Sequence, residues 1–255
     1  MKQQVSDRES AILDILADND ACSVTELAAR LQVSHATVRS TLSSLEERGY
    51  LVRTWGGATA AFHPRILARQ RSMSEEKKRI ARAAAALVQD GDSIMIEAGT
   101  TTALVAAYLT GYKNLSVVTN STLVIPYARS NPRITLTVVG GLFRPETESF
   151  VGPTARELLK RFHVRLAFVG TDGFSLDHGM STQLVEGAEI VQTVAEQADE
   201  TVLLADSSKF GRKGFVHVLP LSAVGRIISD DGIAGRISEQ EREQLAELGV
   251  RVDAV

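Results

Sequence analysis

From residue 93 almost to the end of the chain, short apolar runs with strand propensity alternate with helical stretches. Continuous apolar strands separated by helices are typical of a parallel sheet covered on both faces, because each helix carries the chain back to start the next strand. The sequence therefore predicts an α/β domain with a doubly wound, largely parallel sheet. The expected strands are 93–97, 115–119, 134–139, 166–170, 201–205 and 226–229. The expected helices are 102–109, 122–129, 154–161, 186–197 and 238–248.

The first 57 residues follow a different pattern from the rest of the chain. Residues 8–48 show three helical segments, of which the second is short, and Ser34 can cap the third. Gly49 is a usual helix stop, and the strand-forming residues 50–54 before a Gly-Gly pair predict a hairpin. This layout is that of a winged helix-turn-helix, whose third helix enters the major groove of DNA. A small helical module that binds another protein would show the same pattern.

These two patterns divide the chain into domains. We expect residues 1–57 to form the winged helix-turn-helix and residues 74–255 to form the α/β domain. Residues 58–73 lack a clear period and are the expected linker. The net charge of −3 argues against a protein that coats nucleic acid indiscriminately, but it allows a small DNA-reading head.

The composition excludes several classes of protein. With 255 residues, of which 44% are apolar, the chain can bury a core, so disorder is excluded. No apolar run is long enough for a membrane span and the start of the chain lacks the apolar segment of a secretory signal, so we expect a cytoplasmic protein. The single cysteine, Cys22, cannot form an internal disulfide. No metal-ligand spacing, dinucleotide fingerprint, P-loop or G-x-S-x-G motif occurs, so we expect no metal site and no cofactor.

Small polar residues and glycines follow three successive predicted strands. Ligands of such sheets collect beyond the carboxyl ends of the strands, where loops lead into helices whose first N–H groups favour an anion. The sequence therefore predicts a phosphate-binding site, although the same residue types are also ordinary helix caps and turns. The residues concerned are Glu97, Gly99, Thr100, Thr101, Thr102, Asn120, Ser121, Gly140 and Gly141.

Charged residues follow two later strands. Lys209 can meet a phosphate, and Asp172 and Glu186 can accept hydrogen bonds from sugar hydroxyls. A solvated lysine, a turn aspartate and a glutamate at a helix N-terminus are equally good interpretations of these three residues.

Taken together, these segments resemble the DeoR family of bacterial transcription regulators over nearly the whole chain. The segments that look like the family's helix-turn-helix signature and wing are 33–39 and 53–58. The segments that look like its sensor motifs are 97–102, 118–121, 140–141 and 206–211. The family's sensor resembles ribose-5-phosphate isomerases and CoA transferases in fold, and it binds a phosphorylated sugar or related metabolite without turning it over.

The resemblance implies a DNA-binding transcriptional regulator that is not an enzyme. Family members are mostly repressors of sugar-catabolic operons that the effector releases from double-stranded operator DNA. Because a single head with few basic residues makes few phosphate contacts, we also expect a homodimer or homotetramer. The residues implied to contact DNA are Ser34, His35, Thr37, Val38, Arg39, Thr41, Arg53 and Trp55.

Two departures from the family pattern affect the expected sites. Ser40 and Thr41 stand where the family usually has Arg-Asp, so a basic contact is missing from the reading helix. Glu97 stands where the family commonly has Asp, so a carboxylate is retained with a longer reach.

Two other functions fit the same residues. The first is an isomerase-like enzyme with an accessory head, in which Asp172 or Glu186 is the general base and Lys209 holds the phosphate. The second is a metabolite-binding protein whose head contacts a protein partner.

Overall fold

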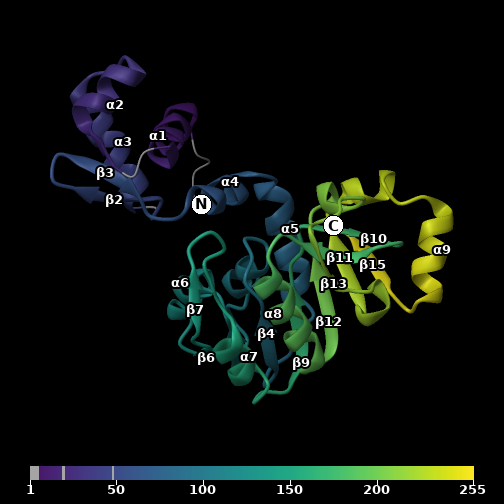
Figure 1. Ribbon diagram of the computed structural model, residues 1–255. Helices are drawn as coiled ribbons and strands as arrows, with labels where there is room; N and C mark the ends of the chain where they lie inside the picture. Colours follow the sequence, from purple (N-terminus) through teal and green to yellow (C-terminus); the bar gives the residue numbers. More distant parts are fainter. Residues whose placement is uncertain (1–5, 19–20, 48) are drawn as a thin grey trace. The chain divides into compact units, whose positions relative to one another are not determined.

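The computed structural model describes residues 6–18, 21–47 and 49–255, which form two compact units. The N-terminal unit contains the described residues up to 72 together with 145–147, and the C-terminal unit is made of 73–144 and 148–255. Figure 1 colours the first purple to blue and the second from blue through teal and green to yellow. Within the described part of the chain, no helix combines the length and the apolar character that a membrane crossing requires.

The N-terminal unit contains the three helices and the hairpin that the sequence predicts, followed by a fourth helix. Ser23 caps the second helix through a capping box, in which its hydroxyl accepts the Glu26 N–H at 3.2 Å and the Glu26 carboxylate accepts the Ser23 N–H at 2.8 Å. Gln32, in the left-handed conformation, ends that helix, and the Ser34 hydroxyl accepts the Thr37 N–H at the start of the next. The elements are α1 (Asp7–Asp18), β1 (Cys22–Ser23), α2 (Val24–Leu31), α3 (His35–Glu47), β2 (Leu51–Thr54), β3 (Gly57–Ala60) and α4 (Pro64–Arg71).

Residues 58–73 differ from the linker expected there. The first of them complete strand β3, and Pro64 then starts the helix α4. Leu67 joins the hydrophobic core of the N-terminal unit, and the Arg71 guanidinium donates to the Ser10 hydroxyl at 2.7 Å and to the Asp14 carboxylate at 2.9 Å. The helix has only eight residues, too few to show a clear period in the sequence. The N-terminal unit therefore extends to residue 72 instead of residue 57.

The C-terminal unit is built on a seven-stranded sheet in the order β15-β14-β12-β9-β4-β5-β6. Every neighbouring pair of strands is parallel, which confirms the predicted doubly wound sheet. Of the strands in this sheet, the sequence analysis missed only the edge strand β15, in which polar and apolar residues alternate. The strands are β4 (Ser93–Ile96), β5 (Leu115–Thr119), β6 (Ile134–Val138), β9 (Val164–Val169), β12 (Ala198–Leu204), β14 (Arg226–Ser229) and β15 (Arg251–Ala254).

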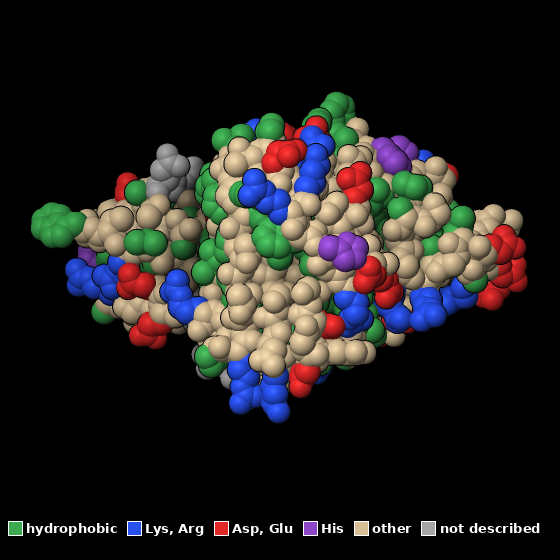
Figure 2. Space-filling model, turned by 90° about the horizontal axis from the view of Figure 1, so that it is seen from below, with side chains coloured by type: hydrophobic (Ala, Val, Ile, Leu, Met, Phe, Trp, Pro, Cys, Tyr) green, Lys and Arg blue, Asp and Glu red, His purple; other side chains and the backbone are tan. Residues whose placement is uncertain are grey.

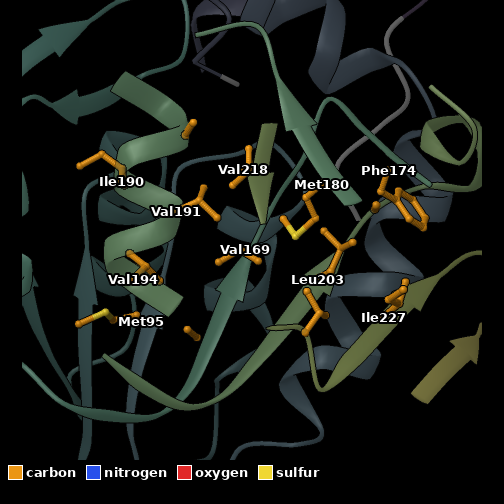
Figure 3. Packing of buried hydrophobic residues seen from close by; sticks show 14 of the residues in the cluster. Met95, Val169, Phe174, Met180, Ile190, Val191, Val194, Leu203, Val218 and Ile227 are labelled. Carbon is orange, nitrogen blue, oxygen red and sulfur yellow. The ribbon is translucent and has the colours of Figure 1, made fainter. Parts of the chain in front are cut away.

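Helices cover both faces of this sheet. α5 (Ser74–Ala85) contacts β12 and β14, and α8 (Val185–Glu196) contacts β9 and β12. Alternate strand residues pack with α8 in the core shown in Figure 3, where side chains from strands and helix meet. The residues labelled there are Met95, Val169, Phe174, Met180, Ile190, Val191, Val194, Leu203, Val218 and Ile227. The remaining helices are η1 (Thr102–Tyr108), η2 (Thr122–Val124), α6 (Ile125–Arg129), α7 (Pro153–Leu159), η3 (Ser207–Lys209), η4 (Leu221–Ala223), η5 (Asp231–Gly235) and α9 (Glu239–Glu247), where η denotes a 3₁₀ helix.

Two small antiparallel sheets, which the sequence analysis did not predict, interrupt the alternation of strands and helices. One is the hairpin of β7 (Leu142–Arg144) and β8 (Ser149–Val151), which follows β6. The other contains β10 (Gly173–Ser175), β11 (Gly179–Thr182) and β13 (Val216–Leu219), in that order. Both are inserted after the carboxyl ends of main-sheet strands, the edge where ligands of such sheets bind.

An ion pair fixes the opposite, amino-terminal edge of the two central strands. The Asp92 carboxylate, just before β4, accepts bonds from the Arg165 guanidinium in β9, at 2.8 Å from Nε and through Nη2, and from the Gln89 N–H at 2.7 Å. Arg165 Nη2 also donates to the Leu87 carbonyl at 2.8 Å. The Arg165 guanidinium holds the pKa of Asp92 below its ordinary value. Two hydrogen bonds from one guanidinium to a nearly buried carboxylate make this a strong interaction.

We expect Asp92→Asn to lower the free energy of unfolding by about 1–3 kcal/mol at pH 7, because the charge-assisted bonds are lost. The folded pKa of Asp92 is lowered, so its contribution is fully present above the ordinary pKa of an aspartate and disappears as the pH falls through the lower folded value. Urea unfolding followed by far-UV circular dichroism at pH 7 and at acid pH measures both effects. Glu75→Gln, which breaks the exposed pair with Lys78, is the control and should change nothing measurable. Equal stability of the two variants at pH 7 would contradict the assignment.

Candidate functional sites

The third helix of the N-terminal unit has one buried and one exposed face. Val38, Leu42 and Leu45 are fully buried in the core of this unit. Val38 therefore cannot contact DNA, and its inclusion among the expected contacts is wrong: a buried apolar side chain holds the helix in place. His35 and Arg39 are exposed, and within the described residues neither side chain has a hydrogen bond or ion pair.

Hydroxyl side chains organise the start of α3. The Ser34 hydroxyl accepts the Thr37 N–H at 3.1 Å and lies 2.8 Å from the Thr37 hydroxyl. The Thr41 hydroxyl donates to the Thr37 carbonyl at 2.9 Å, one turn along the helix. These bonds fix the first turn of α3, so Ser34, Thr37 and Thr41 present partly engaged hydroxyls on the same helix that carries Arg39.

The hairpin of β2 and β3 holds the other expected contacts. The Arg53 guanidinium donates to the Ser43 hydroxyl at 3.2 Å, and the Arg53 N–H donates to the Glu46 carboxylate at 3.2 Å, so this strand is fastened to α3. Trp55, in the turn between the two strands, is fully exposed. The N-terminal unit therefore offers an exposed cation on α3 and an exposed aromatic ring on the hairpin beside it.

One face of the molecule shows no concentration of positive charge. On the face shown in Figure 2, Lys and Arg side chains lie singly or in small groups with Asp and Glu side chains among them. The net charge of the chain is −3. The chain as a whole therefore does not attract nucleic acid through an overall positive charge.

In the C-terminal unit, the strand order reverses between β4 and β9. From β4 the sheet continues through β5 and β6, and from β9 it continues in the other direction through β12, β14 and β15. Ligands of open α/β sheets bind outside the carboxyl ends of the strands at such a switch point. The buried Glu97 carboxylate, directly after β4, accepts the Gly170 N–H directly after β9 at 3.2 Å. Glu97 therefore lies at the centre of the predicted site.

The loop after β4 is fixed by buried polar side chains. The Asn120 amide oxygen accepts the Ala98 N–H at 3.0 Å, and the Asn120 amide nitrogen donates to the Phe150 carbonyl at 3.1 Å. The Thr102 hydroxyl donates to the Gly99 carbonyl at 3.1 Å. Both side chains are buried and hydrogen-bonded to the backbone, so they hold the loop in place.

The same loop presents unused donors. Among the described residues, the N–H groups of Gly99, Thr100 and Thr101 have no acceptor. The Thr101 hydroxyl is also unpaired, although the residue is largely buried. Successive backbone N–H groups of this kind form a concave anion-binding surface.

The segment after this loop differs from the α-helix predicted at 102–109. It is the 3₁₀ helix η1, Thr102–Tyr108. A 3₁₀ helix of this length has poorer hydrogen-bond geometry than an α-helix. The argument for an anion therefore depends on the individual N–H groups of the loop and not on a helix dipole.

Two residues predicted for this edge have structural roles. Ser121 is fully buried, and its hydroxyl accepts the Leu123 N–H at 3.2 Å. Gly141 is packed so closely that a Cβ there would lie 2.7 Å from the Val151 carbonyl oxygen. Gly140, in contrast, has open space around it. Of these three residues, only Gly140 faces space that a ligand can enter.

The charged residues predicted for this edge differ in their availability. The Asp172 carboxylate accepts the Thr182 hydroxyl at 2.9 Å and the Gln183 N–H at 3.1 Å, which ties the loop after β9 to the end of β11. Lys209, half-buried in η3, has no ion pair or side-chain hydrogen bond within the described residues. Phe210, the next residue, packs edge-on against Phe174 of β10 at 5.4 Å between ring centroids. Lys209 is therefore a positive group without an internal partner, placed beside β10.

Glu186 is paired with a residue that the sequence analysis did not identify. Its carboxylate lies 2.5 Å from the guanidinium of Arg144, at the end of β7. A backbone hydrogen bond and the Arg144 guanidinium lower the pKa of Glu186. Arg144 closely follows the Gly140-Gly141 pair, so its place near the predicted site could have been found from the sequence. Its pairing with Glu186 of α8 could not, because no sequence pattern links these two segments.

Hydrogen bonds connect some of the residues that were predicted to form the effector site. Glu97, the 98–102 loop and Asn120 are linked by hydrogen bonds across β4, β5 and β9. In the part of the chain that the structure describes, no group of three or more His, Cys, Asp or Glu side chains is placed to hold a metal ion. A hollow of about 490 Å³ lies between the β10–β11 turn and α9, and no predicted site residue lines it.

Comparison with known proteins gives matches to both units. The family described as DeoR-like helix-turn-helix domain matches residues 8–62, and the family described as DeoR C terminal sensor domain matches residues 72–231. The uncharacterized HTH-type transcriptional regulator YgbI of Escherichia coli strain K12 is 32% identical over 89% of this chain and 90% of its own length. The HTH-type transcriptional repressor GlcR of Bacillus subtilis strain 168 is 32% identical over 88% of each. Among solved structures, ribose 5-phosphate isomerase A of Methanocaldococcus jannaschii aligns over 55% of each chain, with 22% identity and a TM-score of 0.40.

Proposed function

This chain belongs to the DeoR family of transcriptional regulators, and on that premise we propose that it is a repressor whose binding to operator DNA is controlled by a phosphorylated sugar or a related metabolite. The operon it controls would then serve carbohydrate catabolism. The observation that carries the proposal is the row of unpaired N–H groups from Gly99 to Thr101, beside the switch point of the sheet.

The N-terminal unit supports the DNA-binding part of the proposal. Arg39 is exposed on α3 without an internal partner, and a free guanidinium can bond to O6 and N7 of a guanine. Arg53 fastens the hairpin to α3, which fixes Trp55 relative to the reading helix. Ser34 and Thr37 rigidify the first turn of α3. Reading a base sequence requires this rigidity, because it keeps the entropy lost on binding small.

The C-terminal unit supports the part of the proposal that concerns binding of a phosphorylated effector. A phosphate at the 99–101 loop would receive the unpaired backbone donors and the Thr101 hydroxyl. Lys209 would supply the positive charge, and the Glu97 carboxylate would accept hydrogen bonds from sugar hydroxyls. Gly140 leaves open space at the same edge of the sheet.

The carboxylates favour a sensor over an isomerase. A general base works best with a pKa near the operating pH. Asp172 already accepts two hydrogen bonds, and the pKa of Glu186 is lowered by its bonds. Both carboxylates therefore hold the structure together, and binding alone is the function that we propose for this site.

Replacing Arg39 by alanine is expected to weaken binding to operator DNA by about 1–3 kcal/mol, because a base contact is lost. Fluorescence anisotropy at fixed salt, with a labelled duplex from upstream of the gene, measures the change. Arg133→Ala removes an exposed arginine from the C-terminal unit and is the matched control, which should bind DNA like the wild type. Unchanged affinity in the Arg39 variant would show that α3 does not read the DNA.

Lys209→Ala is expected to weaken sugar phosphate binding by about 1.5–3 kcal/mol, the usual contribution of a hydrogen bond to a charged group. Calorimetry against matched phosphorylated and dephosphorylated sugars tests this, and the dephosphorylated forms should not bind. The control is Lys113→Ala, an exposed lysine just before β5, at the opposite edge of the sheet, which should leave binding unchanged. Equal affinity for both forms of a sugar would mean that the phosphate assignment is wrong.

The sensor and isomerase functions also differ in what they do to a bound ligand. Prolonged incubation with the sugar phosphate that binds should yield no isomerised product by NMR, because a sensor needs no proton transfer. Product formed by the wild type but not by Asp172→Asn would establish an enzyme instead.

A further inference from the structure

The turn of the β2–β3 hairpin carries the most exposed large apolar side chain of the described residues, Trp55. Within those residues its indole ring has no hydrogen bond and no ring contact. Figure 1 shows the hairpin in blue, with its turn at the edge of the N-terminal unit. A ring that remains in water adds nothing to the hydrophobic stabilisation of the fold. The packing of the N-terminal unit therefore does not account for a tryptophan at this place.

The backbone holds this ring in a fixed position. The turn consists of Trp55 and Gly56 alone. Gly56 has a φ of +83°, which residues with a side chain rarely adopt, and its carbonyl accepts the Val24 N–H at 2.9 Å. A Cβ on Gly57 would lie 2.2 Å from the Cys22 carbonyl oxygen, so this strand packs directly on β1. Trp55 is therefore exposed on a rigid support and not at the end of a loose loop.

The hairpin carries no charge beyond Arg53. Residues 54–62 contain no Asp, Glu, Lys, Arg or His. The Arg53 guanidinium is bonded to Ser43 of α3, and Val52, on the opposite face of β2, is apolar and 53% exposed. The tip of the hairpin therefore has no cation that could neutralise a phosphate. Any contact that it makes with DNA depends on an aromatic ring.

The attachment of the hairpin to α3 determines which part of a duplex the tip can reach. Arg53 is bonded to Ser43 and Glu46, so the hairpin lies beside the DNA-reading helix. A helix in the major groove has the minor groove next to it, across one phosphate strand. The base edges of the minor groove distinguish few sequences, so proteins read its shape and the deformability of the DNA there. Many of them insert an apolar side chain between two base pairs.

We propose that Trp55 is a wedge of this kind, which enters the minor groove beside α3, inserts its indole ring between two base pairs and kinks the duplex by about 20–90°. Pyrimidine–purine steps such as TA and CA unstack most easily. The protein therefore prefers such a step at the position of Trp55, where α3 contacts no base. This inference rests on the DNA-binding part of the proposed function and adds a second source of sequence preference, which involves no effector.

The first experiment compares Trp55→Ala with Phe215→Ala in the full-length protein. Phe215 lies just before β13 in the C-terminal unit and is 83% exposed, so both substitutions remove an exposed aromatic ring. The gel mobility of complexes with circularly permuted fragments from upstream of the gene measures the bend. The wild type and the Phe215 variant should bend the DNA alike, and the Trp55 variant should lose the bend and bind about tenfold more weakly. Binding without a bend by the wild type, or an equal bend with all three proteins, would overturn the proposal.

Two more substitutions at the same position distinguish a wedge from a contact with phosphate. Trp55→Leu keeps an apolar side chain and should restore part of the bend. Trp55→Arg adds a cation, so the slope of log K against log salt concentration should steepen by about 0.9 without a return of the bend. Trp55→Ala should leave this slope as it is in the wild type. A shallower slope in Trp55→Ala would mean that the indole contacts phosphate, which contradicts a wedge.

Permanganate, which oxidises unstacked thymines, detects the wedge without a measurement of the bend. One thymine of a pyrimidine–purine step beside the α3 site should become reactive with the wild type and stay unreactive with Trp55→Ala. Protection of every thymine in the wild-type complex would contradict the insertion, and so would a protein partner that covers Trp55 while DNA is bound.

The outcomes separate this inference from the proposed function, because none of these measurements contains a sugar phosphate. A protein that kinks DNA but does not respond to sugar phosphates would contradict the proposed function alone. A protein that sugar phosphates release from unbent DNA would contradict the wedge alone. A wild type that binds no duplex would contradict both.

Discussion

The side-chain amide of Asn120 holds together the carboxyl edge of the sheet. Its oxygen accepts the Ala98 N–H from the loop after β4, and its nitrogen donates to the Phe150 carbonyl in β8. The backbone carbonyl of the same residue accepts the Phe150 N–H. A buried amide with both ends satisfied specifies one geometry, because any other arrangement would leave a buried polar group unpaired. The position of the 98–102 loop and the orientation of the β7–β8 hairpin both depend on this residue.

Through Asn120, the candidate effector site and the β7–β8 hairpin share one set of hydrogen bonds. A ligand that reorients the 98–102 loop would change the bond to Ala98, and the same amide positions Phe150, across the hairpin from Phe143. The position of the inner strand of the hairpin, β8, is therefore tied to the loop of the candidate site through one buried side chain.

Features with a regular sequence pattern, such as buried strands, were predicted from the sequence. Features that depend on contacts between distant residues were not. The strands of the main sheet were predictable because buried parallel strands are continuously apolar. β15 was missed because its apolar residues, Val252 and Ala254, alternate with the polar Arg251 and Asp253. Helix α4 has too few residues to show a helical period, and η1 follows a capping pattern that fits an α-helix equally well.

In the candidate site, Glu97 and the 99–101 loop were identified from their place after a strand. The role of Arg144 was not, because Glu186, its partner, lies 42 residues away in the chain. Val38 was predicted to contact DNA because it lies in the same sequence motif as Arg39. A motif of this kind does not separate residues of the core from residues that contact a ligand.

Trp55 is the only tryptophan in the chain, and it is fully exposed in the turn of the β2–β3 hairpin. Its indole ring is surrounded by water in the folded protein, as it would be in the unfolded chain. Its fluorescence therefore changes little when the packing of either hydrophobic core changes. The same emission is an intrinsic reporter of whatever covers the tip of the wing, and no other tryptophan contributes to it.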